Sequence, residues 1–106
     1  MIINFVPIQV DYDITIERRG DSIVIDGEEF DFSPLPEGAR LPISAISSTH
    51  FSGNVSRVNG LINMSIRLPH GPNASYDRRY IEAVINPDNG PLDLPAYDVK
   101  EDRGDV

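Results

Sequence analysis

The sequence predicts an all-β domain, mainly antiparallel, built from hairpins and meanders as a small sandwich or barrel. Two dipeptides, Asp26-Gly27 and Asn59-Gly60, are preferred at the centre of two-residue hairpin turns, where both residues need a positive φ angle. Apolar and polar residues alternate beside these turns, as is typical of strands with one buried face. Short strands with turn signals at this spacing indicate a sandwich or small barrel.

The composition limits the classes of protein to consider. The chain has 106 residues, enough for the core of one domain. It has no cysteine, which excludes disulfides and thiolate metal sites. The 9 basic and 17 acidic residues give a net charge of −8, which disfavours direct contact with nucleic acid or an anionic membrane. Without a signal-peptide pattern or an apolar run of about 20 residues, we expect a protein that folds inside a cell.

The N-terminal third predicts a strand followed by a three-stranded meander. Pro7 removes a backbone donor from the first strand, within residues 1–10, and predicts an edge position or a strand end. In the meander, residues 12–32, the Asp26-Gly27 turn places Ile23 opposite Phe30. Arg19-Gly20 as a second two-residue turn places Ile16 opposite Ile23. The isoleucines then share one face, which a one-residue slip would reverse.

The middle of the chain predicts a loop and at most one short helical turn. Residues 33–42 contain three prolines, so we expect a surface connection with Leu35 and Leu41 beneath it. Pro42 suits the first position of a helix in residues 43–50. The serines and threonine that follow are poor helix formers, which limits this helix to a turn or two.

The second half predicts a hairpin, a central strand and a charged tail. The Asn59-Gly60 turn places Val58 opposite Leu61, and the alternation in residues 62–68 predicts a half-buried strand. Residues 76–85, apolar on both faces, are expected to form a more central strand. A turn at residues 86–91 precedes a short strand at residues 92–94. The domain is thus assigned to residues 1–96, and the polar tail 97–106 is expected to be disordered.

The sequence predicts no catalytic, cofactor-binding or metal-binding residues. His50 and His70 lack the spacing that a metal site requires, and no GxSxG motif accompanies the serines near His50. Asp11 and Asp13 point from one strand face, but residues 86–90 do not match a calcium loop. We therefore expect a protein without a cofactor that is not an enzyme.

Three segments of the chain carry a family resemblance: MIINFVPIQ, GEEFDFSPLPEGA and RLPHGPN, starting at residues 1, 27 and 67. They resemble small acidic proteins encoded near tail genes in tailed-phage and prophage genomes. This resemblance spans roughly residues 1–95. It implies a phage-related setting and no conventional enzyme. It carries over no site residues, because the members of that family are uncharacterised.

Three functions remain open. The first is a minor virion component or tail-assembly accessory that contacts other phage structural or assembly proteins, in the cytoplasm of the infected or lysogenic host or in the virion. Contacts are expected at unpaired strand edges and at two proline-rich loops, residues 34–42 and 69–75. The loop residues singled out are Leu35, Glu37, Arg40, His70 and Asn73. The alternative is an acidic inhibitor that mimics nucleic acid towards a host protein. A hydrolase or metal-dependent activity at His70 or the aspartates is a third option, and homo-oligomerisation is left open.

Overall fold

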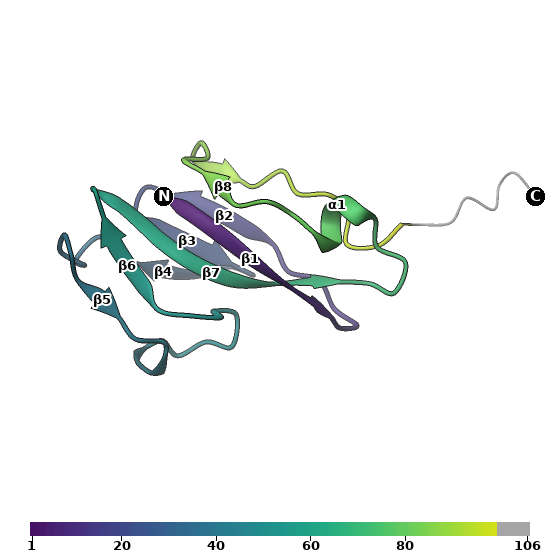
Figure 1. Ribbon diagram of the computed structural model, residues 1–106, viewed down its shortest axis with the longest axis horizontal. Coiled ribbons are helices and arrows are strands. Elements are labelled where there is room, and N and C mark those ends of the chain that lie inside the picture. Colours follow the sequence, from purple (N-terminus) through teal and green to yellow (C-terminus); the bar gives the residue numbers. More distant parts are fainter. Residues whose placement is uncertain (100–106) are drawn as a thin grey trace, which may run out of the picture.

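The computed structural model describes residues 1–99 and shows two β-sheets packed face to face (Figure 1). Sheet A has the order β5-β6-β7-β1-β8, with β1 Ile2–Gln9, β5 Arg40–Leu41, β6 Val55–Val58, β7 Leu61–His70 and β8 Val84–Ile85. Sheet B has the order β4-β3-β2-β9, with β2 Ile16–Arg19, β3 Ser22–Ile25, β4 Glu28–Asp31 and β9 Gly90–Pro91. The predicted all-β class is confirmed, and the two separate sheets make it a sandwich.

Two short helical turns interrupt the strands. The expected turn is present as a 3-10 helix, η1 at Ile43–Ala45, with Pro42 as its extended N-cap. The second, α1 at Tyr76–Arg79, was not expected and corrects the prediction of at most one helical turn. No helix in residues 1–99 is long and apolar enough to cross a membrane.

A parallel pair of strands, β1 and β7, forms the middle of sheet A. Their register runs from Ile2 opposite Asn63 to Gln9 opposite His70. Alternate side chains of β7 are almost completely buried: Ile62, Met64, Ile66 and Leu68. The predicted half-buried strand is therefore confirmed. Its parallel partner was not foreseen, because hairpin signals report only local, antiparallel pairing.

The position of Pro7 agrees with a strand that has one neighbour. Strand β8 pairs with β1 only at Ile2 and Ile3, so among the described residues the remainder of β1 pairs with β7 alone. A proline is tolerated in such a one-sided stretch because no ladder hydrogen bond is needed from its nitrogen there.

Sheet B confirms one predicted register and corrects the other. Asp26 and Gly27 have φ angles of 51° and 82°, as a type I′ turn requires, and Ile23 lies opposite Phe30. In the first hairpin, however, Ile16 pairs with Ile25 rather than with Ile23. The turn residues are Gly20 and Asp21 instead of Arg19 and Gly20. The two-residue shift keeps each side chain on its predicted face, since side chains alternate with a period of two.

Phe51 fills the centre of the sandwich. It is fully buried and bridges to Ile66 of sheet A. Its ring makes edge-to-face contacts with Phe30 and Phe32, at centroid distances of 5.0 and 5.8 Å. This aromatic cluster therefore joins the two sheets. Leu35 and Leu41 pack against the same core, as expected for the loop that carries them.

Residues 76–85 do not form the central strand that the sequence predicts. The Ser75 side chain accepts a hydrogen bond from the Arg78 backbone at 3.3 Å and caps α1 instead. Only Val84–Ile85 joins sheet A, and Tyr80 and Ile85 are 64% and 66% exposed. The prediction assumed that apolar residues on both faces of this segment are buried, whereas these large side chains face solvent.

The C-terminal part of the domain also differs from expectation. The last strand lies at Gly90–Pro91, whereas Leu92 and Leu94 follow it and pack against the core. The expected tail begins at residue 97, yet the backbone at residues 97 and 99 is hydrogen-bonded to the domain. The rest of that expected tail, residues 100–106, lies outside the described residues.

We predict that Phe51→Ala will lower the free energy of unfolding by about 3–5 kcal/mol, because a buried aromatic ring is lost and a cavity remains. The matched control is Val58→Ala, at a side chain that is 50% exposed, which should change stability by less than about 0.5 kcal/mol. Urea denaturation measures both. Equal effects of the two substitutions would contradict the assignment of Phe51 to the centre of the core.

Candidate protein-contact surface

The structure places the five predicted contact residues at opposite ends of the sandwich (Figure 1). Leu35 and Glu37 precede β5 and Arg40 lies in it, whereas His70 and Asn73 lie where β7 ends and the chain turns towards α1. They do not form one site. The two proline-rich loops are therefore two separate surfaces.

In the first loop, Glu37 has a structural role. Its carboxylate accepts hydrogen bonds from the backbone N–H groups of Asn59 and Gly60, at 2.8 and 2.7 Å. Leu35 is half-buried and lines an apolar cleft of about 210 Å³ with neighbouring prolines. Arg40 is exposed on the short edge strand β5. This loop is thus fastened to the β6–β7 turn.

In the second loop, Asn73 binds the C-terminal segment. Its backbone N–H donates to the Asp98 carboxylate at 2.7 Å, and its carbonyl accepts from the Val99 N–H at 3.2 Å. The ring of His70 contacts the neighbouring carbonyl of Gly71, with Nδ1 2.9 Å from the oxygen. Both predicted residues therefore make contacts within the chain.

Tyr97 attaches the same segment to the end of β1. Its hydroxyl donates a hydrogen bond to the Val10 carbonyl. Burial, and then the negative charges of Asp98, Asp11 and Asp13, raise the pKa of Tyr97 above its ordinary value of 10.0. The phenol therefore stays protonated at neutral pH and remains a donor.

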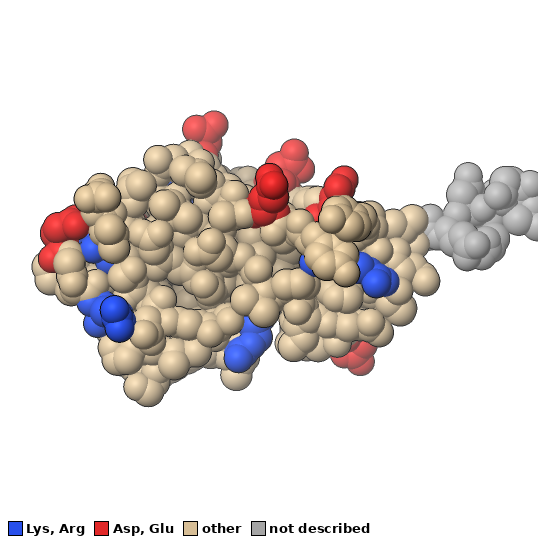
Figure 2. Space-filling model, in the orientation of Figure 1, with Lys and Arg blue, Asp and Glu red and all other residues tan. Residues whose placement is uncertain are grey.

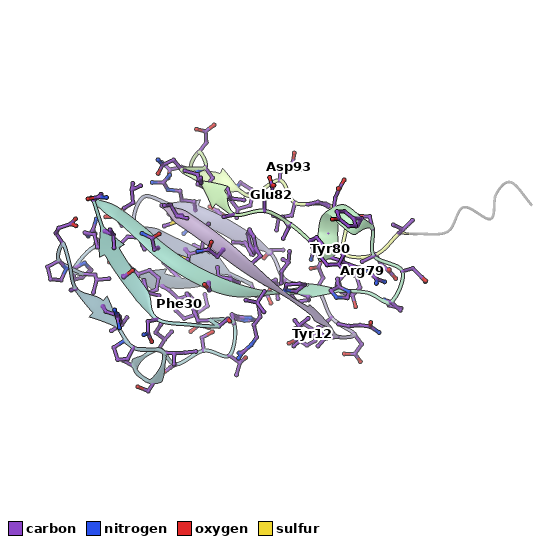
Figure 3. The ribbon with its side chains drawn as sticks, viewed as in Figure 1. Tyr12, Phe30, Arg79, Tyr80, Glu82 and Asp93 are labelled. Carbon is purple, nitrogen blue, oxygen red and sulfur yellow. The ribbon has the colours of Figure 1, made fainter. Side chains whose placement is uncertain are left out.

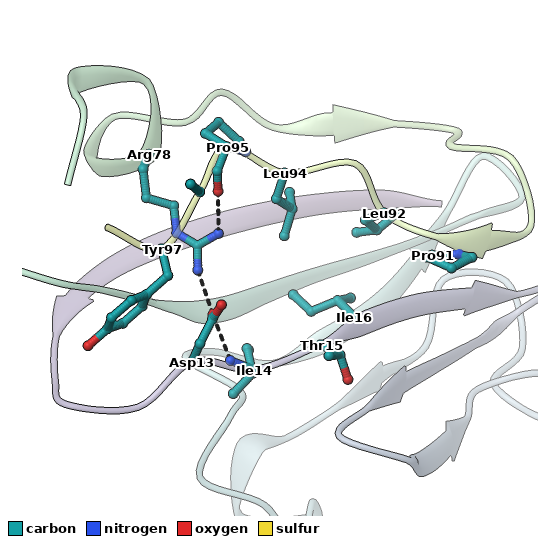
Figure 4. A pocket seen from close by; sticks show the side chains of 11 residues that line it. Asp13, Ile14, Thr15, Ile16, Arg78, Pro91, Leu92, Leu94, Pro95 and Tyr97 are labelled. Atoms are coloured by element: carbon teal, nitrogen blue, oxygen red, sulfur yellow. Dashed lines mark hydrogen bonds and ion pairs between the residues drawn. The ribbon is translucent and has the colours of Figure 1, made fainter. Parts of the chain in front are cut away.

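A buried arginine holds α1 in place. Arg78 is 3% exposed, and its guanidinium donates to the Pro69 carbonyl at 2.7 and 3.0 Å. It also donates to the Pro95 carbonyl at 2.7 Å and to the Asp13 carboxylate at 2.8 Å (Figure 4). The surrounding cleft measures about 250 Å³. A single helical turn is not stable by itself in water, so these bonds fix its orientation. Arg78 thereby joins the end of β7, the C-terminal segment and the entry to β2.

The outer side of α1 presents two exposed aromatic rings. Tyr76 and Tyr80 are 74% and 64% exposed, and their ring centroids are 4.7 Å apart with the planes tilted by 37°. They line a shallow groove of about 520 Å³, here called the α1 groove. Figure 3 shows Tyr80 at the end of α1 and Glu82 on the segment that follows it. The groove consists of Tyr76, Asp77, Tyr80, Ile81, Glu82 and Pro95.

This groove was not predicted from the sequence, although two signals could have indicated it. Ser75 followed by Asp77 is a helix start, with an N-cap and an acidic residue in the first turn. Tyr76 and Tyr80 are spaced i, i+4, which places both rings on one side of a helix. The apolar content of residues 80–85 obscured these signals.

The strand edges in residues 1–99 are poorly suited to pairing with another chain. Strands β5, β8 and β9 have two residues each. Strand β4 carries Glu28, Glu29 and Asp31, and the open part of β1 contains Pro7. Short length, charge and proline all discourage strand addition. Addition of a strand from another chain is therefore disfavoured at these edges.

Several carboxylates are paired within the domain. Arg19 contacts both Glu17 and Glu29, at 3.0 and 3.5 Å, and Arg57 contacts Asp21 at 2.9 Å. On the face shown in Figure 2, acidic groups lie along the upper edge with other residues between them, and acidic and basic groups adjoin at the left-hand end. Among the described residues, no three histidine, aspartate or glutamate side chains group as metal ligands would.

Comparisons with protein-family models, with curated proteins and with solved structures find no match to this chain.

We predict that Arg78→Ala will lower the free energy of unfolding by about 2–4 kcal/mol, because it leaves the buried Pro69 carbonyl and the partly buried Pro95 carbonyl without donors. Arg78→Lys should recover only part of this loss, since an ammonium cannot reproduce the planar fork of the guanidinium. The matched control is Arg40→Ala at an exposed site, expected within about 0.5 kcal/mol of the unmodified protein. Chemical denaturation that finds Arg78→Ala as stable as Arg40→Ala would contradict the role of Arg78.

We also predict that the Asp31 carboxyl will titrate below its ordinary pKa of 3.8. The Ser33 backbone N–H, the Ser33 hydroxyl and then the Ser22 hydroxyl donate hydrogen bonds that favour the ionised form. A lowered pKa in the folded state means that this carboxylate adds stability above its unfolded pKa, and that the contribution is lost as pH falls through the folded pKa. A carbon-detected NMR titration measures it, and Ser33→Ala should raise it. A pKa at or above 3.8 would be the contrary result.

Proposed function

We propose that this protein is a non-enzymatic contact protein that binds another protein through the α1 groove. The observation that carries the proposal is the pair of largely exposed tyrosines, Tyr76 and Tyr80, on a helical turn held by Arg78. Tyrosine is enriched at protein interfaces because its ring supplies contact area and its hydroxyl a hydrogen bond. A surface fixed before binding loses less entropy when a partner docks.

The proposed setting is tailed-phage or prophage biology, with the protein as a minor virion component or tail-assembly accessory. This part of the proposal is supported by the resemblance carried by the segments at residues 1–9, 27–39 and 67–73. Its partners would be other phage structural or assembly proteins, in the host cytoplasm or the virion. The proposal involves no direct contact with nucleic acid or a membrane, in keeping with the net charge of −8.

The alternative, an acidic mimic of nucleic acid, has weaker support. Such a mimic needs free carboxylates at spacings like those of phosphates. Here Glu17, Glu29, Asp21 and Asp13 are paired with arginines, and Glu37 binds backbone N–H groups. The exposed tyrosine pair therefore favours protein contact.

The test is a pull-down from phage-infected or prophage-induced cells, with mass spectrometry of the retained proteins. The tag belongs at the C-terminus, because Met1 is buried and its amine donates to Asn86 Oδ1 at 2.6 Å. We expect phage tail or baseplate proteins in the eluate. The double variant Tyr76→Ala/Tyr80→Ala should lose them, whereas Tyr12→Ala, at another exposed tyrosine, should retain them.

Two results would count against the proposal. Equal retention by the double variant and the Tyr12→Ala control would move the contact away from the α1 groove. A host nuclease, polymerase or repressor as the retained protein would favour the acidic mimic. Thermal unfolding of both variants establishes that they are folded, because exposed side chains should contribute little to stability.

A further inference from the structure

We infer that the α1 groove takes a basic segment of its partner, with an arginine or lysine side chain lying against the tyrosine rings. This inference rests on the proposed function, in that it assumes the groove to be the contact surface, and it adds the chemistry of the occupant. Three features of the groove support this inference. The arginines of α1 bind other groups, the carboxylates of the groove have no ion-pair partner among the described residues, and the walls are aromatic and apolar.

Both arginines of α1 are already bound to other groups. Arg78 donates to Pro69, Pro95 and Asp13. Arg79 donates to the carbonyls of Ala74 and Pro72, at 3.1 and 2.7 Å. Their side chains therefore bind the loop and the C-terminal segment instead of the groove. Arg79 keeps its charge, since carbonyl groups do not neutralise a guanidinium, but neither arginine lines the groove itself.

The carboxylates of the groove have no such partners. Asp77 and Glu82 are exposed, and neither takes part in an ion pair among the described residues. These two carboxylates form the acidic rim of the groove, and Figure 3 shows Glu82 on the segment that follows α1. A cation would be attracted to this rim, and the overall charge of −8 would assist its approach from a distance.

The walls of the groove suit the rest of such a side chain. Ile81 and Pro95 offer apolar surface for the aliphatic stem of an arginine or lysine. The exposed faces of Tyr76 and Tyr80 offer cation–π contact, which an arginine makes more often than a lysine. A planar guanidinium can stack on a ring while it donates to a carboxylate. The tyrosine rings, the apolar residues and the carboxylates of the groove thus match the guanidinium plane, the aliphatic stem and the N–H donors of one arginine side chain.

The experiment is an NMR titration of the isotope-labelled full chain with a blocked peptide of alternating glycine and arginine. The control peptide carries glutamate in place of arginine. We expect the arginine peptide to shift the backbone amide signals of residues 76–82, and the glutamate peptide to leave them unchanged. Higher salt should weaken the binding, because the attracting charges are exposed to solvent.

Two substitutions with matched controls locate the binding. Tyr80→Ala should weaken it by at least about threefold through loss of the cation–π contact. Glu82→Gln should weaken it by about two- to fivefold through loss of an exposed ion pair. Tyr12→Ala and Glu28→Gln make the same chemical changes at exposed positions outside the groove and should leave the affinity unchanged.

Equal binding of the two peptides, shifts confined to another surface, or full affinity in Tyr80→Ala would overturn the inference. These failures differ from failure of the proposed function. If the pull-down retains tail proteins through the α1 groove but the arginine peptide causes no shifts, the contact function stands and its occupant is not basic. If the peptide binds in the groove but no phage protein is retained, basic recognition stands and the phage setting is wrong.

Discussion

The pairing of β1 with β7 is the constraint on which the rest of the sandwich depends. It sets the N-terminal strand in the middle of sheet A and gives that sheet its apolar inner face, formed by Ile3 and alternate residues of β7. Strands β6 and β5 extend the sheet on one side and β8 on the other. Phe51 then joins this face to the aromatic residues of sheet B. The core is thus built on contacts between residues far apart in the sequence.

The candidate surface depends on a second interaction, the burial of Arg78. A buried guanidinium is costly unless its donors are hydrogen-bonded and its charge is paired. Here it donates to two carbonyl groups and to one carboxylate. Because this side chain points inward, the tyrosines two residues before and after it point outward. The polar residue is inside and the aromatic residues are outside, which is the reverse of the usual arrangement.

The features that could be predicted from the sequence are those that depend on local chemistry. Turns at Asp26-Gly27 and Asn59-Gly60 were predicted correctly because their chemistry is local and the φ angles required are specific. The parallel pairing of β1 was missed, since no short motif encodes a distant partner. Glu37 was predicted as a contact residue because its loop looked exposed. Only the structure shows that its carboxylate binds the β6–β7 turn.

The same parallel pairing has a consequence for the order of folding. Strand β7 can pair with β6 as soon as their short hairpin is available, but β1 pairs with residues that lie about sixty positions later, from Asn63 onward. The entropy of closing so long a loop is lost before the central contacts are gained. Strand β1 is therefore completed late although it precedes β7 in the chain, and we expect folding in milliseconds to seconds, as for other β proteins dominated by long-range contacts.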